Sequence, residues 1–550
     1  MPSVRSKSRP FSQWGRLLLL GVLTLALAPP VAAQHFLPDD PLWSDPDRMD
    51  MPFPEPQPAD AVGGGPGQFV RRLLRPPIED PDPAANTNTV EGVPNSSWYT
   101  NRHYRVPMSD AALQRGPNAT PGPAMHSPWR VEKIQDGSPP QATVRDSTGR
   151  RFRLLFDAKA HPELATGAAM VSSRLLYALG YNVPHYWLRT VDRDRLVPDA
   201  NVTDAGIDSL LARTSRRPDD TYRVLVSRIP GVEREIGPFA FHGSRVDDAN
   251  DIFPHEDRRE LRGLRVVAAW IHHSMIRHRY TLDVGVQERG RRFVRHYLTD
   301  LHLTLGSAGA QPKPRWSGHK HLLELDQVLE RIATIGLSGG DWLDTNLPDL
   351  PAVGQFESDG FLPKTWRPEW PNPAFQRATP ADAFWAAKKI RHFSRSDIAA
   401  IVETADYSSP ATETYIIDTL LRRRNAIGQA YLHWGGGLAR FTVQEDQLRF
   451  RDLRAHHHYA PDSLQRTVTW HVFKNRDNEL GRRLDRSTTS REVIPIPSSR
   501  ASFLRARLQS EHRGETRVFL RRTISQTKPL PPMDMPYEVV GIERRGPPAD

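Results

Sequence analysis

Residues 272–307 carry the residue types and the spacing of a phosphoryl-transfer site. They read as a loop that leaves a helix, then two short strands, then Asp300 close to Gly306. In such sites an Asp after the later strand binds the main metal ion, while the earlier loop supplies a proton-accepting Asp and a metal-binding Asn. Met275 and Tyr280 stand where that Asp and Asn are expected. Asp300 is therefore the candidate metal ligand of this stretch.

Six segments of the chain resemble a largely uncharacterised family of bacterial exported proteins with a protein-kinase-like or lipid-kinase-like core. The segments are VPNSSWYTNR (93–102), LLFDAKAHPELATGA (154–168), LLYALGYNVP (175–184), HYLTDLHLTLGS (296–307), WRPEWPNPAF (366–375) and ATPADAFWAAKKI (378–390). The resemblance covers roughly residues 90–430. It implies an α+β fold with a two-lobed kinase-like core, in which a strand Lys, a helix Glu, a loop Asp, a loop Asn and a late Asp perform the chemistry.

The resemblance fails at most of the residues that carry this chemistry. The strand Lys position is Leu155, the helix Glu position is Ala169, and the two loop positions are Met275 and Tyr280, so that Asp300 alone keeps its type. Leu155 and Ala169 together remove both partners of an ion pair, which avoids leaving one buried charge alone. Loss of the proton acceptor and of a metal ligand should lower the rate by many orders of magnitude. The resemblance therefore implies a pseudoenzyme.

Two charged residues nearby are poor replacements for the missing groups. Lys159 lies four residues beyond Leu155, which is about 13 Å along an extended strand. Asp283 is the carboxylate nearest to the loop, but it lies on the predicted strand beyond it. A metal-dependent phosphotransferase with relocated catalytic residues, using Mg²⁺ and a nucleotide, stays open as the alternative. Under the pseudoenzyme reading we expect no cofactor.

The elements around these positions follow from periodicity. In the domain expected at 91–240, alternation predicts strands within 128–156 with a turn at DSTGR, and further strands at YWLRTV and TYRVLVSRI. A helix after His161 should end at Gly180. Trp98 and Tyr99 should dock the preceding Pro-rich arm, residues 34–90, on the core. Such an arm has a composition that buries little apolar surface.

A helical domain is expected at 241–434, followed by a β-sandwich at 435–550. A helix should follow Glu256, and others are expected at 322–333, 380–391, 395–404 and 411–431, with Thr379, Pro380 and Asp382 starting one of them. KTWRPEWPNPAF (364–375) should be an extended segment held in a groove, or alternatively a binding platform. Six short alternating runs after residue 437 predict the β-sandwich.

Other chemistry-bearing clusters favour structural interpretations. The run His456–His458 has no spaced partner for a metal and should be a solvated loop. His272, His273, His278 and His296 gather in sequence around the predicted cleft, where His296 could face His272. The run Arg422–Arg424 fits a solvated last turn of a helix as well as an anion site.

The ends of the chain differ in composition from its middle. Residues 1–33 predict a secretory signal peptide, because a basic segment precedes a short apolar run and Val31-Ala32-Ala33. There is no cysteine, which excludes a disulfide scaffold, zinc–thiolate sites and cysteine nucleophiles. From Arg440 onward 21 basic residues face 14 acidic ones, so the positive net charge gathers there.

These observations lead to one favoured function and two alternatives. The favoured one is an exported, kinase-like pseudoenzyme, periplasmic or secreted, that acts as a binding or scaffold module in the bacterial envelope. Its partner would be an envelope protein or an anionic polymer, with the cleft binding a ligand weakly or not at all. The first alternative is the phosphotransferase, and the second is a basic module that binds acidic glycan or nucleic acid. No transmembrane segment is expected after signal cleavage.

Overall fold

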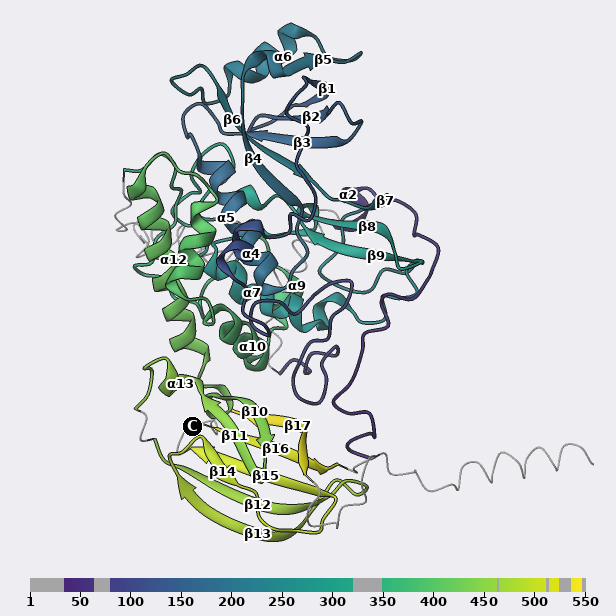
Figure 1. Ribbon diagram of the computed structural model, residues 1–550, viewed down its shortest axis with the longest axis vertical. Coiled ribbons are helices and arrows are strands. Elements are labelled where there is room, and N and C mark those ends of the chain that lie inside the picture. The colour runs from purple at the N-terminus through teal and green to yellow at the C-terminus, as the bar shows by residue number, and fades with distance from the viewer. Residues whose placement is uncertain are drawn as a thin grey trace, which may run out of the picture.

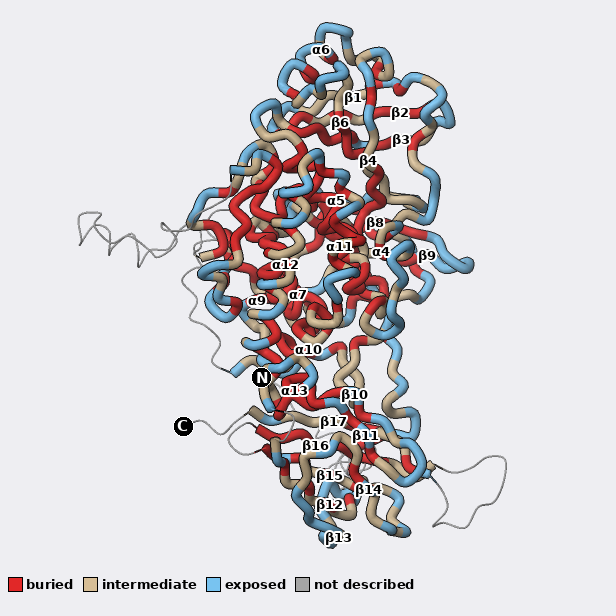
Figure 2. The backbone as a smooth tube through the Cα atoms, turned by 60° about the vertical axis from the view of Figure 1, so that its left-hand side comes forward, coloured by how far each residue is buried: buried red, intermediate tan, exposed pale blue. Residues whose placement is uncertain are grey.

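The computed structural model describes residues 34–63, 80–319, 349–461, 464–510, 514–523 and 536–546. Figure 1 shows three parts stacked along the long axis: an N-terminal sheet at one end, a helical part in the middle and a pair of C-terminal sheets at the other end. Buried backbone is densest in the middle part (Figure 2). The architecture is mixed α+β, as the sequence predicts. The predicted signal peptide lies outside the described residues.

A six-stranded sheet forms the N-terminal part, with the strand order β4-β6-β3-β2-β1-β5. Its strands are β1 (Trp129–Gln135), β2 (Gln141–Arg145), β3 (Arg151–Phe156), β4 (His185–Val191), β5 (Leu196–Pro198) and β6 (Tyr222–Arg228). One face of the sheet packs on α6 (Asp204–Ala212) around Ala142, Val144 and Leu210. Neither α6 nor β5 was predicted, because both are too short to show a clear period.

Helix α5 (Leu164–Leu179) connects β3 to β4 and is buried along almost its whole length. The Asp157 carboxylate fixes its first turn by accepting hydrogen bonds of 2.9 Å from two backbone N–H groups. Gly180 ends the helix with a φ of 122°, where a Cβ atom would come within 2.3 Å of the Tyr99 ring. The prediction that this helix ends at Gly180 is confirmed. The close approach of the Tyr99 ring is a second reason why a glycine is required there.

A three-stranded antiparallel sheet lies beside the middle part, with the order β7-β8-β9. Its strands are β7 (Val232–Gly237), β8 (Thr281–Glu288) and β9 (Arg291–Leu298). The predicted hairpin is confirmed in β8 and β9, while β7 was not predicted. The 3₁₀ turns η3 (His278–Tyr280) and η4 (Leu301–Leu303) precede and follow this hairpin.

The middle part is built from helices around one large hydrophobic core. They are α4 (Asp110–Arg115), α7 (Arg259–Trp270), α9 (Pro373–Gln376), α10 (Pro380–Ile390), α11 (Arg395–Glu403) and α12 (Pro410–Tyr431), whereas the short helix α2 (Ala59–Gly63) of the arm contacts η3. Thr379 and Asp382 form the capping box of α10, as predicted. The helix expected at 322–333 lies outside the described residues. Among the described residues, no helix combines the length and apolar character that crossing a membrane requires.

Two antiparallel sheets form the C-terminal part and share one hydrophobic core, in agreement with a β-sandwich. The first sheet holds β10 (Leu438–Gln444), β11 (Gln447–Asp452) and β14 (Val493–Pro495). The second has the order β13-β12-β15-β16-β17, with β12 (Arg466–Lys474), β13 (Glu479–Thr489), β15 (Phe503–Ser510), β16 (Glu515–Arg522) and β17 (Tyr537–Arg545). The sequence did not predict β13, because its side chains are largely charged and exposed.

The arm of residues 34–90 is bound more tightly than its composition suggests. Figure 1 shows it running from the C-terminal sheets past the β7–β9 sheet toward the helical part. Phe36 is 3% exposed and packs in the C-terminal part. Asp45 forms a fully buried ion pair of 2.9 Å with Arg258, the residue directly before α7. The expectation of a loosely wrapped arm is wrong for the described part, because charged and aromatic side chains rather than aliphatic ones attach it.

The segment KTWRPEWPNPAF (364–375) is only partly extended. Its last residues start α9, whose first turn is capped by Asn372. Trp366 and Phe375 are buried in the central core. The buried aromatic rings make this segment a part of the core, and the alternative of an exposed binding platform is not supported by their burial.

Candidate functional site

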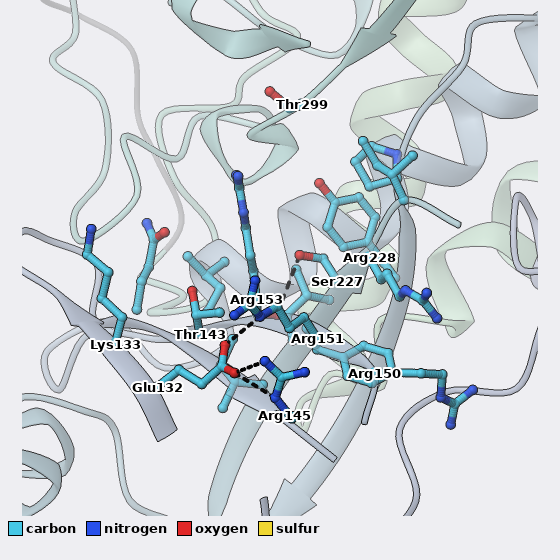
Figure 3. Close-up of a pocket in the computed structure, with 18 of the residues that line it drawn as sticks. Glu132, Lys133, Thr143, Arg145, Arg150, Arg151, Arg153, Ser227, Arg228 and Thr299 are labelled. Carbon is cyan, nitrogen blue, oxygen red and sulfur yellow. Dashed lines mark hydrogen bonds and ion pairs between the residues drawn. The ribbon is translucent and has the colours of Figure 1, made fainter. Parts of the chain in front are cut away.

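A cleft of about 1060 Å³ lies between the N-terminal sheet and the turn that follows β9. Its roof comes from β1, β2, β3 and β6, and its floor includes Thr299, Asp300 and His302. Figure 3 shows Lys133 and Arg153 extending from the sheet toward the side that carries Thr299, whereas Arg150 and Arg228 extend sideways. The cleft thus lies where two lobes meet, between the strands of the roof and a turn at least 70 residues further along the chain.

Strand register explains why the roof is basic. Arg145 pairs with Arg151 and Thr143 pairs with Arg153 across β2 and β3, and these alternate residues line the cleft. The residues between them, such as Val144, point to the core under α6. Since side chains alternate along a strand, the β3 sequence RFRLLF places Arg151 and Arg153 on one face of the sheet.

Six basic and four acidic side chains line the cleft. The basic ones are Lys133, Arg145, Arg150, Arg151, Arg153 and Arg228, and the acidic ones are Glu132, Asp199, Glu235 and Asp300. Glu132 binds two of the arginines, with distances of 2.5 Å to Arg145 and 2.8 Å to Arg151 (Figure 3). Arg150 forms an ion pair of 3.0 Å with Asp146.

Arg153 and Arg228 are different, because neither guanidinium has an ion pair or a hydrogen bond to any residue of the described ranges. The Arg153 side chain extends from the sheet toward the side of the cleft that carries Thr299 (Figure 3). Arg228 lies over the Phe152 ring, 5.8 Å from its centroid. A guanidinium presents a planar fork of donors that suits phosphate and carboxylate groups. Arg153 therefore offers a cationic fork to an anionic ligand in the cleft, whereas Arg228 extends from the Phe152 side of the sheet.

Leu155 and Ala169 form part of the wall of this cleft. Leu155 is 8% exposed on β3, Ala169 is 1% exposed on α5, and both belong to the central hydrophobic core. The positions that the resemblance assigns to a Lys–Glu pair are thus packed with apolar side chains. This arrangement can exclude water from the wall, but it cannot position a phosphate.

Asp300 lies at the floor in a left-handed backbone conformation, with φ 54° and ψ 40°. One of its carboxylate oxygens accepts a hydrogen bond of 2.9 Å from Thr299 Oγ1, and the other lies 4.0 Å from His302 Nδ1. Burial, and next the charge of Asp300, raises the pKa of Tyr186. Burial lowers the pKa of His302 although Asp300 opposes this shift. The floor therefore combines one carboxylate with a neutral imidazole and a neutral phenol.

Met275 and Tyr280 lie outside the lining of the cleft. Tyr280 contacts Arg277, whose guanidinium lies 5.2 Å from the ring centroid, and its backbone carbonyl accepts from the Thr299 N–H. The structure thus brings together Leu155, Ala169 and Asp300 of the predicted site but not the two loop positions.

Neither proposed replacement reaches the cleft. Lys159 is exposed beyond the end of β3, and Asp283 is 1% exposed on β8. The Asp283 carboxylate is occupied by His296 Nδ1 at 2.7 Å. Both residues are therefore absent from the lining, as the poor spacing and placement read from the sequence suggested.

The histidines near the hairpin are structural. His296 stacks face to face on Trp98, with ring centroids 3.5 Å apart, so it does not face His272 as we considered. His272 is buried against Arg423, and burial lowers the pKa values of His272 and His273. Trp98 and Tyr99 are buried, which confirms that this segment docks on the core.

The remaining clusters agree with their sequence interpretation only in part, since His456 and His458 are exposed as expected. Arg423 lies within α12 and is 1% exposed, donating to the carbonyls of Trp270, Ala269 and Glu357, so the arginine run is not a solvated last turn. His456 ends the short helix α13 (Leu453–His456). No group of three His, Asp or Glu residues able to hold a metal occurs among the described residues.

This donor set does not fit a kinase-type metal–nucleotide centre. Of the catalytic residues that the resemblance implies, Asp300 alone keeps its type. Leu155 and Ala169 carry no charge that could bind the phosphate groups of a nucleotide. The sequence reasoning missed the arginines of the roof, although the alternation of Arg151, Arg153 and Leu155 was a usable signal. We derive no phosphoryl-transfer step from this site.

The chain matches no protein-family model, no curated protein and no solved structure. The kinase-like core and the family resemblance therefore stay predictions, which rest on the sequence segments and on the placement of the residues described above.

Proposed function

We propose that this protein is an exported, kinase-like pseudoenzyme whose inter-lobe cleft binds an anionic ligand without transferring a phosphoryl group. The observation that carries the proposal is the composition of the cleft. Arg153 and Arg228 line it without a counter-ion among the described residues, while Leu155 and Ala169 are apolar where the resemblance implies an ion pair. A site of this kind can hold charge, but it lacks the groups that would act on it.

The order of elements supports a kinase-like origin for the cleft. A sheet, the helix α5 after β3, and a hairpin that ends in an Asp-containing turn contribute to one inter-lobe space. Export to the envelope is inferred from the signal-like residues 1–33. A compartment that normally lacks ATP is consistent with a cleft that has lost catalysis.

The alternative is a metal-dependent phosphotransferase with relocated groups, and the position of Asp300 on the floor favours it. This alternative requires a metal ion to bind at Asp300 and a proton acceptor from elsewhere. The two proposals predict different ligands: the pseudoenzyme binds the anion itself through arginine, whereas the phosphotransferase binds a metal–nucleotide complex through Asp300.

A thermal-shift titration separates these two proposals. The protein is titrated with ATP, ADP and GTP, each with and without Mg²⁺ or Mn²⁺, and a ligand at a hundred times its Kd should add about 2.7 kcal/mol of stability. We expect a shift that is independent of metal, is retained in Asp300→Ala and is lost in Arg153→Gln/Arg228→Gln. The double variant Arg115→Gln/Arg289→Gln removes two exposed arginines elsewhere and serves as the charge control.

The opposite pattern would overturn the proposal. A shift that requires metal and disappears in Asp300→Ala would establish the phosphotransferase alternative. The absence of a shift with every nucleotide would remove nucleotides as ligands, and a smaller anion such as tripolyphosphate would then have to bind for the anion-binding proposal to survive.

A further inference from the structure

A basic surface lies on the outer face of the five-stranded C-terminal sheet, in a different part of the chain from the cleft. We call it the basic sheet face, and its members are His471, Arg483, Arg486, Arg505, Arg507 and Arg517. The alternate residues of the same strands, including Trp470, Ala506 and Val518, fill the sandwich core. The members therefore point away from the core and toward solvent.

Strand pairing sets these side chains in two rows. In one row Arg483 lies opposite His471, which lies opposite Arg505. In the other, Arg507 lies directly opposite Arg517 on β16. Neighbouring strands are about 4.8 Å apart and alternate residues about 7 Å apart along a strand, so the cations form a regular array. Like charges placed directly opposite destabilise a sheet, which favours a function for this arrangement over a stabilising role.

The acidic residues of this face neutralise only part of the array. Glu515 lies 2.5 Å from both Arg507 and Arg517, and Glu543 lies 3.5 Å from Arg517. Arg483, Arg486 and Arg505 have no ion pair or side-chain hydrogen bond to the residues that the structure describes, and the Nε atom of Arg505 is among the unsatisfied buried donors. Three guanidinium groups thus remain for an external anion.

The closeness of these cationic groups affects the pKa of His471. Burial, and next the charges of Arg505, Arg483 and Arg507, lowers the pKa of His471. The imidazole therefore stays neutral beside three cations, and its position places it at the centre of the array. β13 is the edge strand of this sheet and its arginines are exposed, so the array is open to a long ligand at that edge (Figure 2).

The aromatic part of the same outer face is already covered. Phe473 and Phe519 pack against Phe36 of the arm, with ring centroids 6.1 and 5.0 Å from that of Phe36. Phe519 lies directly opposite Arg505 but is only 2% exposed, so it offers no stacking surface to a ligand. Single-stranded nucleic acid is usually held by aromatic stacking together with basic residues. The array supplies cations without an exposed aromatic surface for stacking. This favours an anionic polymer without nucleobases as the ligand.

We propose that the basic sheet face binds an acidic polysaccharide, a linear glycan that carries carboxylate groups at regular intervals. Arg483, Arg486 and Arg505 form its primary contacts, and Arg507 and Arg517 extend the array across the sheet. Guanidinium groups bind carboxylates through paired hydrogen bonds. The regular spacing of the rows suits a polymer with a repeating charge better than it suits a single small anion.

The test measures the affinity of the full chain for fluorescently labelled polygalacturonate. The variant Arg483→Gln/Arg486→Gln/Arg505→Gln removes the three unpaired cations. The control Arg105→Gln/Arg115→Gln/Arg289→Gln removes three exposed arginines of the other parts and changes the net charge equally. We expect the first triple variant to bind about tenfold more weakly or worse, and the control to bind like the unmodified protein.

Each other outcome overturns a defined part of the proposal. Equal weakening in both triple variants would mean that net charge alone drives binding. Tighter binding of a single-stranded oligonucleotide of matched charge than of polygalacturonate would replace the glycan by nucleic acid. Absence of binding to polygalacturonate at low salt would show that the basic sheet face is not a glycan-binding site. Thermal unfolding of both triple variants must match that of the unmodified chain, so that a loss of binding reports the surface and not the fold.

Discussion

Leu155 on β3 lies directly opposite Leu225 on β6, and both side chains line the cleft between the lobes. Leu155 occupies the position where the sequence resemblance implies a catalytic lysine. With Leu155 8% and Leu225 2% exposed, this wall of the cleft is apolar and closely packed. The surrounding residues therefore accommodate an apolar side chain at this position, which makes the introduction of a charge a direct test.

The substitution Leu155→Lys should destabilise the protein by about 3 kcal/mol, because it places an unpaired cation beside Leu225 and Ala169. Leu155→Met is the control, since it keeps the volume and the apolar character and should cost less than about 1.5 kcal/mol. Chemical denaturation of both variants measures the difference. Equal stability of the two variants would show that the cleft already holds an acceptor for the cation.

The arm should depend on one aromatic contact with the C-terminal sheet. Phe36 is 3% exposed, and its ring lies 5.0 Å from that of Phe519. Phe36→Ala should therefore destabilise the docked arm by about 3 kcal/mol, through lost burial and the cavity left behind. Limited proteolysis of the arm measures this effect.

Leu37→Ala is the matched control for the arm, because Leu37 is 59% exposed and its loss should leave cleavage unchanged. An arm that is cleaved at the same rate in Phe36→Ala and in the unmodified protein would contradict the contact.

Buried histidine should make the protein sensitive to acid. Burial, and next the charge of Lys313, lowers the pKa of His273 from 6.5 to about 3. Between these pH values the unfolded chain binds a proton at His273 that the folded chain does not. Stability should therefore fall as the pH falls through this window, with a slope of about 1.4 kcal/mol per pH unit from this group.

His273→Asn should remove this part of the acid sensitivity, whereas the same change at the exposed His126 should leave it intact. Denaturation at pH 7, 5 and 4 measures the slopes. A slope in His273→Asn that equals that of the unmodified protein would show that His273 carries its proton in the folded state.

Much of the fold could be predicted where local signals agree. The end of α5 at Gly180 and the start of α10 at Thr379 follow from residues that favour these positions for local physical reasons. The missed elements lack such signals. Strand β13 is held by pairing with β12, although its charged sequence shows no buried face. Tertiary context, not propensity, decides this strand.

The candidate site was predictable only in part for a similar reason. The resemblance named Leu155, Ala169 and Asp300, and the structure places all three around one cleft. It also named Met275 and Tyr280, which lie outside the lining. The basic roof was missed because its members become neighbours only through the register of β2 and β3. Cross-strand register is not readable from one strand alone.

We expect arginines of the cleft to bind an anion without help from a metal ion. Titration calorimetry with tripolyphosphate, in EDTA and then in Mg²⁺, measures this binding. Binding in EDTA should weaken at least about tenfold in Arg153→Gln/Arg228→Gln and persist in Asp300→Ala. Binding that occurs only with Mg²⁺ and is abolished by Asp300→Ala would contradict this expectation, because Asp300 and a metal ion would then form the site.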